Sequence, residues 1–192
     1  MPIRNDRELE QTCRQSGDLL QEIQDYCGRD SRHPLAKVRF PRGYILTANA
    51  YRRTLPCVHD AHTQSNLSYA LMTLDVLRWL GVRTNLTGTA LEMVIKEAIC
   101  LLGSICECLT VRKGVEGLGR GAGFSNRTTR LVQMGIIEEN TKTDLDWIWD
   151  IRCREHLVDL DHAEFGHYGP ADCNRAIKAF RELRDGLSER YS

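Results

Sequence analysis

Apolar residues recur along this chain mainly at the three- and four-residue spacing of helices. Over residues 59–80 they form one continuous stripe, and Gly81 follows it at the position of a C-terminal cap, so a helix is predicted there. Residues 89–111 are apolar on nearly every side, which is typical of a helix at the centre of a bundle. A more polar stripe predicts a first helix over residues 5–27, which Gly28 ends.

Glycine and proline residues mark the predicted helix boundaries in the second half of the chain. Five glycines within residues 114–123 exclude a helix there. Helices are predicted over residues 125–134 and over residues 145–162, the latter after a cap at Thr143. A last helix begins at Pro170, which suits a first turn. No segment alternates like a strand, so the predicted fold class is all-α, an up-and-down bundle of about five main helices.

Residues 30–56 show the weakest pattern and mark a division of the chain. Prolines and a glycine interrupt this stretch before an arginine-flanked helical piece over residues 44–55. We therefore expect residues 1–55 to be an N-terminal helical extension and connector, and residues 56–192 to form the bundle domain. With 192 residues, 42% of them hydrophobic, the chain is long enough to bury one substantial core.

Charge and hydropathy narrow the classes of partner. Twenty-six basic residues balance twenty-six acidic ones, so a nucleic acid would have to be held by a local patch and not by the net field. No apolar run reaches the roughly 18 residues that indicate a membrane span, and residues 1–9 are charged and unlike a signal peptide. These features predict a cytoplasmic protein without a membrane partner.

The cysteines and histidines predict neither a metal site nor a cofactor. The eight cysteines are scattered without a paired CxxC motif and are expected to be reduced, mostly buried thiols. Two incomplete sets of metal ligands are present, namely Cys57 with His59 and His62, and His156 with His162 and Glu164. Because neither set supplies four ligands at a recognised spacing, we expect no metal.

Two polar residues interrupt the apolar stripe of residues 145–162. Arg152 and His156 lie one helical turn apart, so both face the same patch. Burying an unpaired guanidinium costs several kcal/mol, so this face needs a carboxylate, a partner subunit or a phosphate. Glu97 and Glu107 are the candidate carboxylates. The face is either a core ion pair beside a core histidine, or a cleft or dimer seam where histidine moves protons and arginine neutralises a phosphate.

The run LDWIWDIRCREHL, residues 145–157, is followed by one more amphipathic helix and resembles the signature helix of the HEPN superfamily. In that superfamily an arginine and a histidine face each other across a dimer of helical bundles. The resemblance implies a homodimer and a metal-independent endoribonuclease, in which Arg152 holds the scissile phosphate and His156 transfers protons at the ribose 2′-hydroxyl. Three residues separate Arg152 from His156, where the superfamily usually has four to six, and Cys153 occupies a usually polar position.

The expected function is therefore RNA binding by a homodimer. Endonucleolytic cleavage by Arg152 and His156, in stress or defence, is what the resemblance adds. Arg154, Arg127 and Arg130 are the expected contacts to the RNA backbone. A non-catalytic interaction or scaffold module, with Arg152 locked in an ion pair, stays open as the alternative, as does a regulatory protein partner.

The glycine-rich segment 114–123 has basic neighbours, and its amides are unobstructed by side chains. Such a loop can hold a polyanion. It lacks the GK[ST] ending of a nucleotide-binding P-loop, however, and it follows no strand. A mobile connector between two helices is therefore the favoured interpretation.

Overall fold

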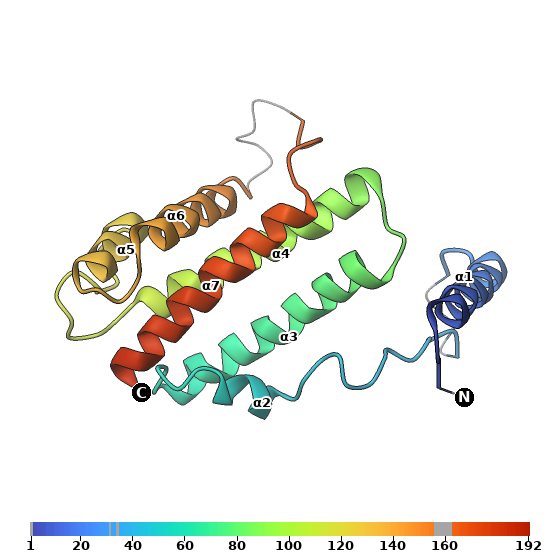
Figure 1. Cartoon of the computed structure of the whole chain (residues 1–192), viewed down its shortest axis with the longest axis horizontal. Helices are drawn as coiled ribbons and strands as arrows, with labels where there is room; N and C mark the ends of the chain where they lie inside the picture. The colour runs from blue at the N-terminus through green and yellow to red at the C-terminus, as the bar shows by residue number, and fades with distance from the viewer. Residues whose placement is uncertain (1, 31, 34, 156–162) are drawn as a thin grey trace. The chain divides into compact units, whose positions relative to one another are not determined.

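A computed structural model describes residues 2–30, 32–33, 35–155 and 163–192 (Figure 1). The chain divides into two units, Met1–Arg42 and Gly43–Ser192. The first unit contains α1 (Asp6–Cys27). The second contains α2 (Ala48–Arg53), α3 (Ala61–Arg83), α4 (Gly88–Thr110), α5 (Phe124–Gln133), α6 (Glu139–Cys153) and α7 (Pro170–Tyr191). No strand occurs among the described residues, and the all-α prediction is confirmed.

Helix α4 is the centre of the second unit, as its nearly continuous apolar surface predicts. It contacts α3, α5, α6 and α7, and Figure 1 shows α3, α4, α6 and α7 running roughly alongside one another. Ile99, Leu102 and Ile105 of α4 are at most 1% exposed. They pack with fully buried leucines and isoleucines from the helices around them, including Leu145 and Leu183. Among the described residues, no helix combines the length and apolar character needed to cross a membrane.

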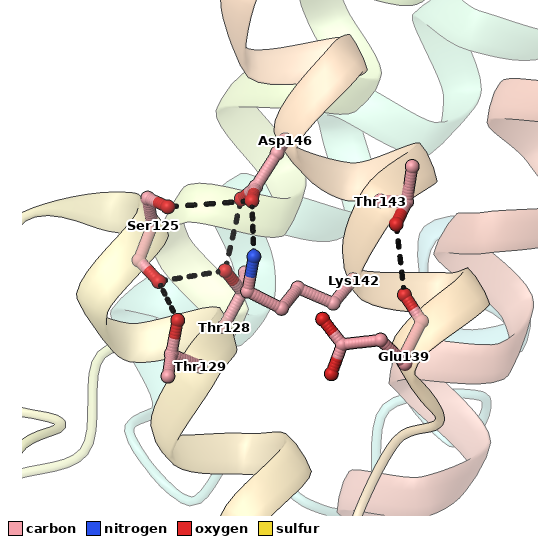
Figure 2. Close-up of polar contacts among 7 residues, drawn as sticks. All are labelled: Ser125, Thr128, Thr129, Glu139, Lys142, Thr143 and Asp146. Atoms are coloured by element: carbon pink, nitrogen blue, oxygen red, sulfur yellow. Dashed lines mark hydrogen bonds and ion pairs between the residues drawn. The ribbon is translucent and has the colours of Figure 1, made fainter.

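Three predicted helix ends differ from the structure. The helix predicted over residues 145–162 is α6, which ends at Cys153 and is followed by Arg154 as its C-cap. Gly81 lies inside α3, which continues to Arg83 and ends at Thr84, whose hydroxyl donates to the Leu80 carbonyl oxygen at 2.6 Å. Helix α6 begins at Glu139 and not after Thr143. The Thr143 hydroxyl donates to the Glu139 carbonyl oxygen at 3.0 Å (Figure 2), a bond that a threonine makes inside a helix and not at its cap.

Residues 43–55 belong to the bundle unit, although the sequence pattern assigns them to the extension. Tyr51 on α2 is 7% exposed and Leu55 is fully buried, and both lie in the bundle core. The Tyr51 hydroxyl donates to the Asp75 carboxylate on α3, and it accepts a hydrogen bond from the Leu46 amide at 3.2 Å. Burial and this carboxylate raise the pKa of Tyr51 to about 12. A satisfied buried phenol therefore attaches α2 to α3.

The first unit presents an amphipathic helix whose apolar stripe is uncovered within the unit. Asn5 caps α1 by accepting from the Glu8 amide at 2.9 Å, and Gly28 follows the helix with φ 58°, as predicted. No residue of α1 is buried. Leu19 is 60% exposed and Tyr26 is 82% exposed, so α1 contributes little to a core.

One close backbone approach sets the position of α7. A Cβ atom added to Gly186 would collide with the carbonyl oxygen of Ile136, in the segment before α6. Only glycine fits there, because the neighbouring atom is backbone and cannot rotate away.

We expect Gly186→Ala to lower the free energy of unfolding by about 1–3 kcal/mol, since the added methyl group forces α7 away from Ile136. Urea unfolding followed by circular dichroism measures the change. Gly81→Ala is the matched control, because its Cβ would meet only Leu91 at 3.7 Å. Equal stability of the two variants would show that the close approach at Gly186 is not tight.

A buried ion pair fastens the segment before α7 to α4. The Lys96 ammonium lies 2.6 Å from one carboxylate oxygen of Glu164 and 2.5 Å from the other. The side chains are 3% and 10% exposed. One turn earlier on α4, the Glu92 carboxylate accepts from the amides of Gly166 and His167. Burial alone would lower the pKa of Lys96, but the hydrogen bond and charge of Glu164 outweigh it, and the pKa lies above its ordinary value.

We expect Glu164→Gln to destabilise the fold by about 3–5 kcal/mol near pH 7, because it leaves the Lys96 charge buried and unpaired. The pKa of Lys96 is raised in the folded state. The ion pair therefore contributes its full stabilisation of the fold below the ordinary lysine pKa, and this contribution is lost as the pH rises through the raised pKa of Lys96. The difference in the free energy of unfolding between the native protein and Glu164→Gln should therefore decrease above about pH 10. Glu189→Gln on exposed α7 surface is the control. A difference in the free energy of unfolding that stays constant up to about pH 11 would contradict the stabilising role of the Lys96–Glu164 ion pair.

Candidate functional site

Arg152 lies in the last turn of α6, where this helix packs closely against Gly103 of α4. The buried positions of α6 are Thr141, Leu145, Ile148 and Ile151. Cys153, which the predicted stripe includes, is exposed instead. A Cβ atom on Gly103 of α4 would lie 2.9 Å from the Cβ of Arg152, so the arginine stem packs directly on the α4 backbone. This contact places the base of the Arg152 side chain at the edge of the core.

The Arg152 guanidinium has two neighbours, a carboxylate beyond hydrogen-bond distance and an aromatic ring that it contacts. Its Nη2 lies 3.9 Å from the Glu107 carboxylate, beyond hydrogen-bond distance, and the two side chains are 35% and 38% exposed. The guanidinium carbon lies 5.0 Å from the centre of the Trp149 ring. That ring stacks on Phe124 at 4.8 Å. Within the described part of the chain, Arg152 Nε is buried without a hydrogen-bond acceptor. The exposed part of the guanidinium has no hydrogen-bonded carboxylate and can therefore still bind an anion.

Of the two candidate carboxylates, Glu107 is the one that lies beside Arg152. Glu97 is exposed, and the carboxylate beside Arg152 is Glu107, ten residues further along α4. His156 and His162 lie outside the described residues, so the distance between Arg152 and His156 stays untested.

The three predicted RNA contacts differ in exposure. Arg154 follows α6 and is exposed. Arg130 is half-buried, donates to Gln133 at 3.3 Å and lies against Gly117. Arg127, in contrast, is 3% exposed and does not lie on the outer surface.

Buried Arg127 is bound by neutral groups. Its Nε donates to the Thr110 hydroxyl at 3.0 Å, and its Nη1 donates to the Ala122 carbonyl oxygen. Burial lowers the pKa of Arg127, and the Glu107 charge opposes this effect. Sequence alone could not reveal this environment, because it depends on the end of α4 and the glycine-rich loop meeting at α5.

A cleft of about 1310 Å³ opens beside this arginine, and the predicted site includes only Arg127 and Glu107 of its lining. The start of α3, the C-terminal half of α4, the glycine-rich loop and the end of α7 form its walls. The charged lining residues are Asp60, Glu107, Arg112, Lys113, Arg120 and Arg127. Because Glu107 also neighbours Arg152, the cleft adjoins the Arg152 surface. The basic residues flanking the glycines are the signal in the sequence that pointed to it.

A second polar cluster, between α5 and α6, has balanced charges. The Asp146 carboxylate accepts from Ser125 at 3.3 Å, from Thr128 at 2.9 Å and from the Lys142 ammonium at 2.7 Å (Figure 2). This bond to Asp146 raises the pKa of Lys142. Since its carboxylate has cationic and hydroxyl partners, the cluster fastens α5 to α6 and offers no free charge to a ligand.

Metal and thiol chemistry find little support in residues 2–155 and 163–192. Across the described positions no three His, Cys, Asp or Glu side chains gather as metal ligands. All eight cysteines are free. Burial raises the pKa of Cys100 to about 11 and that of Cys106 to about 12, so both stay protonated and unreactive near neutral pH.

No protein-family model, curated protein or solved structure matches this chain. The likeness to the HEPN superfamily therefore depends on the run of residues 145–157 and on the helical pattern around it.

We expect Glu107→Gln to change the free energy of unfolding by less than about 1 kcal/mol, because a half-exposed pair at 3.9 Å contributes little. Chemical denaturation of the variant and the native protein, compared at low and high salt, measures this difference. A loss above about 3 kcal/mol would show that Glu107 and Arg152 form a structural pair of the kind found in a protein core.

Proposed function

We propose that the bundle binds RNA and that Arg152 is its principal phosphate-binding side chain. The observation that carries this proposal is a half-exposed guanidinium with no hydrogen-bonded carboxylate and with a buried Nε that has no acceptor in the described residues. A phosphate can approach such a group to about 2.8 Å and accept two parallel hydrogen bonds, which Glu107 at 3.9 Å does not do.

Trp149 supports this role by contacting the guanidinium, whose carbon lies 5.0 Å from the ring centre, while the same ring stacks on Phe124. These contacts restrict the motion of the Arg152 side chain, and its exposed part stays available to a ligand. A side chain that is already ordered loses less conformational entropy when a ligand binds. Exposed Arg154, two residues further along, adds a second cation beside the same phosphate chain.

Cleavage is the finer part of the proposal and depends on His156. The HEPN resemblance implies that His156 transfers protons at the ribose 2′-hydroxyl while Arg152 neutralises the charge that develops on the phosphate. It also implies that two copies of the chain meet at this surface. Such a reaction needs no metal, because the 2′-hydroxyl of the substrate is the nucleophile.

A non-catalytic scaffold is the second candidate, and one observation favours it. The stem of Arg152 packs on Gly103, so the residue also fills space between α4 and α6. In this interpretation the Glu107 carboxylate is its permanent partner and the surface contacts another protein. RNA binding distinguishes the two candidates.

We expect Arg152→Gln to weaken binding of a fluorescent single-stranded RNA by roughly tenfold or more, since a charge-assisted bond to phosphate is lost. Fluorescence anisotropy of the full chain over a salt series gives the affinity, and the salt slope should fall by about 0.7 for each phosphate contact removed. Arg181→Gln, an equal charge change on the exposed surface of α7, is the matched control. Equal affinities of the two variants would contradict the proposal.

The cleavage arm uses the same RNA in EDTA, with products resolved on a denaturing gel. We expect the native protein to cut the RNA and His156→Ala to leave it intact while binding it normally. RNA binding without any cutting by the native protein would support a binding protein and remove the nuclease from the proposal.

A further inference from the structure

The cleft beside the glycine-rich loop holds more positive charge than its own carboxylates neutralise. Four cationic side chains line it, Arg112, Lys113, Arg120 and Arg127, against the carboxylates of Asp60 and Glu107. Both carboxylates have other partners. Asp60 caps α3 by accepting from the Thr63 amide at 2.7 Å, and Glu107 faces Arg152.

Arg112 is positioned with one edge of its guanidinium unused. Its Nη1 donates to the Cys57 carbonyl oxygen at 2.5 Å, and its guanidinium carbon lies 5.0 Å from the centre of the Tyr191 ring. Its Nε and Nη2 are buried and have no acceptor in the part of the chain that is described. These two parallel donors form the edge that binds an oxyanion side-on.

Arg127 is a second buried cation in the same cleft without a contacting carboxylate. Among the described ion pairs it forms none, and its hydrogen bonds go to a hydroxyl and a carbonyl oxygen. Burial against neutral groups lowers its pKa, which means that its environment disfavours the charged form. An anion in the cleft would reverse that effect.

The glycine-rich loop is attached beside the end of α4. The Arg112 amide donates to the Leu118 carbonyl oxygen at 2.7 Å, and Leu118 is fully buried. Gly114 and Gly117 have φ near 80°, which only glycine adopts readily. This turn brings Arg120 to the same cleft as Arg112. Because Arg112 Nε and Nη2 are buried, an anion reaches them when the groups around them shift.

We propose that this cleft binds a ligand with linked phosphate groups, and that Arg112 holds one of them through Nε and Nη2. Arg112 and Arg127 carry two positive charges without a contacting carboxylate among the described ion pairs, and one diphosphate supplies matching negative charge. The cleft volume of about 1310 Å³ also exceeds what a single phosphate fills. The ligand is either a free diphosphate or the phosphorylated 5′ end of an RNA. This site uses residues other than Arg152, so it stands independently of the proposed function.

Isothermal titration of the full chain with inorganic pyrophosphate tests the inference. We expect saturable binding that Arg112→Gln weakens by roughly tenfold or more. Arg120→Gln, at an exposed position of the loop, should weaken binding by a smaller factor without disturbing the fold. Arg181→Gln, on the exposed surface of α7, is the control that should bind pyrophosphate as the native protein does. Thermal unfolding of each variant establishes that it is folded.

A second arm identifies the source of the phosphates, using one RNA sequence with a 5′-triphosphate or a 5′-hydroxyl end. A preference for the triphosphate that Arg112→Gln abolishes assigns the cleft to RNA ends. Pyrophosphate binding without such a preference assigns it to a free anion. Absence of binding to both probes, or binding that neither Arg112→Gln nor Arg120→Gln weakens, overturns the inference. A loss of RNA affinity confined to Arg152→Gln would leave the proposed function standing while this site fails.

Discussion

The close approach of α6 to α4 at Gly103 determines the rest of the site. Because position 103 lacks a Cβ, the Arg152 stem lies on the α4 backbone, and its guanidinium reaches Glu107 one turn further along that helix. Trp149, one turn earlier on α6, lies against the same guanidinium. A larger residue at position 103 would separate the two helices and move all three groups together.

Glu107 connects two systems of positive charge. It neighbours Arg152 on one side, and on the other it lines the cleft and offsets part of the burial of Arg127. One carboxylate cannot neutralise both arginines, so an excess of positive charge remains at the C-terminal half of α4. The net charge of zero hides this local excess, because the balancing acids lie elsewhere on the chain.

The sequence predicts the helices well because their apolar stripes are long and regular. The central position of α4 follows from its apolar surface in the same way. The partner of Arg152 could not be chosen between Glu97 and Glu107, since the register of α6 against α4 is a tertiary property. Nor could the burial of Arg127 be predicted, because its acceptors come from segments distant in sequence or within a glycine-rich loop.

The central claim is that Arg152 is positioned to bind a phosphate and that the negative charge of Glu107 weakens this binding. A double-mutant cycle in RNA affinity tests it most directly, with Glu107→Gln made in the native protein and in Arg152→Gln. The account predicts that Glu107→Gln strengthens RNA binding when Arg152 is present and has a clearly smaller effect when it is absent. An equal effect of Glu107→Gln in both backgrounds would contradict it.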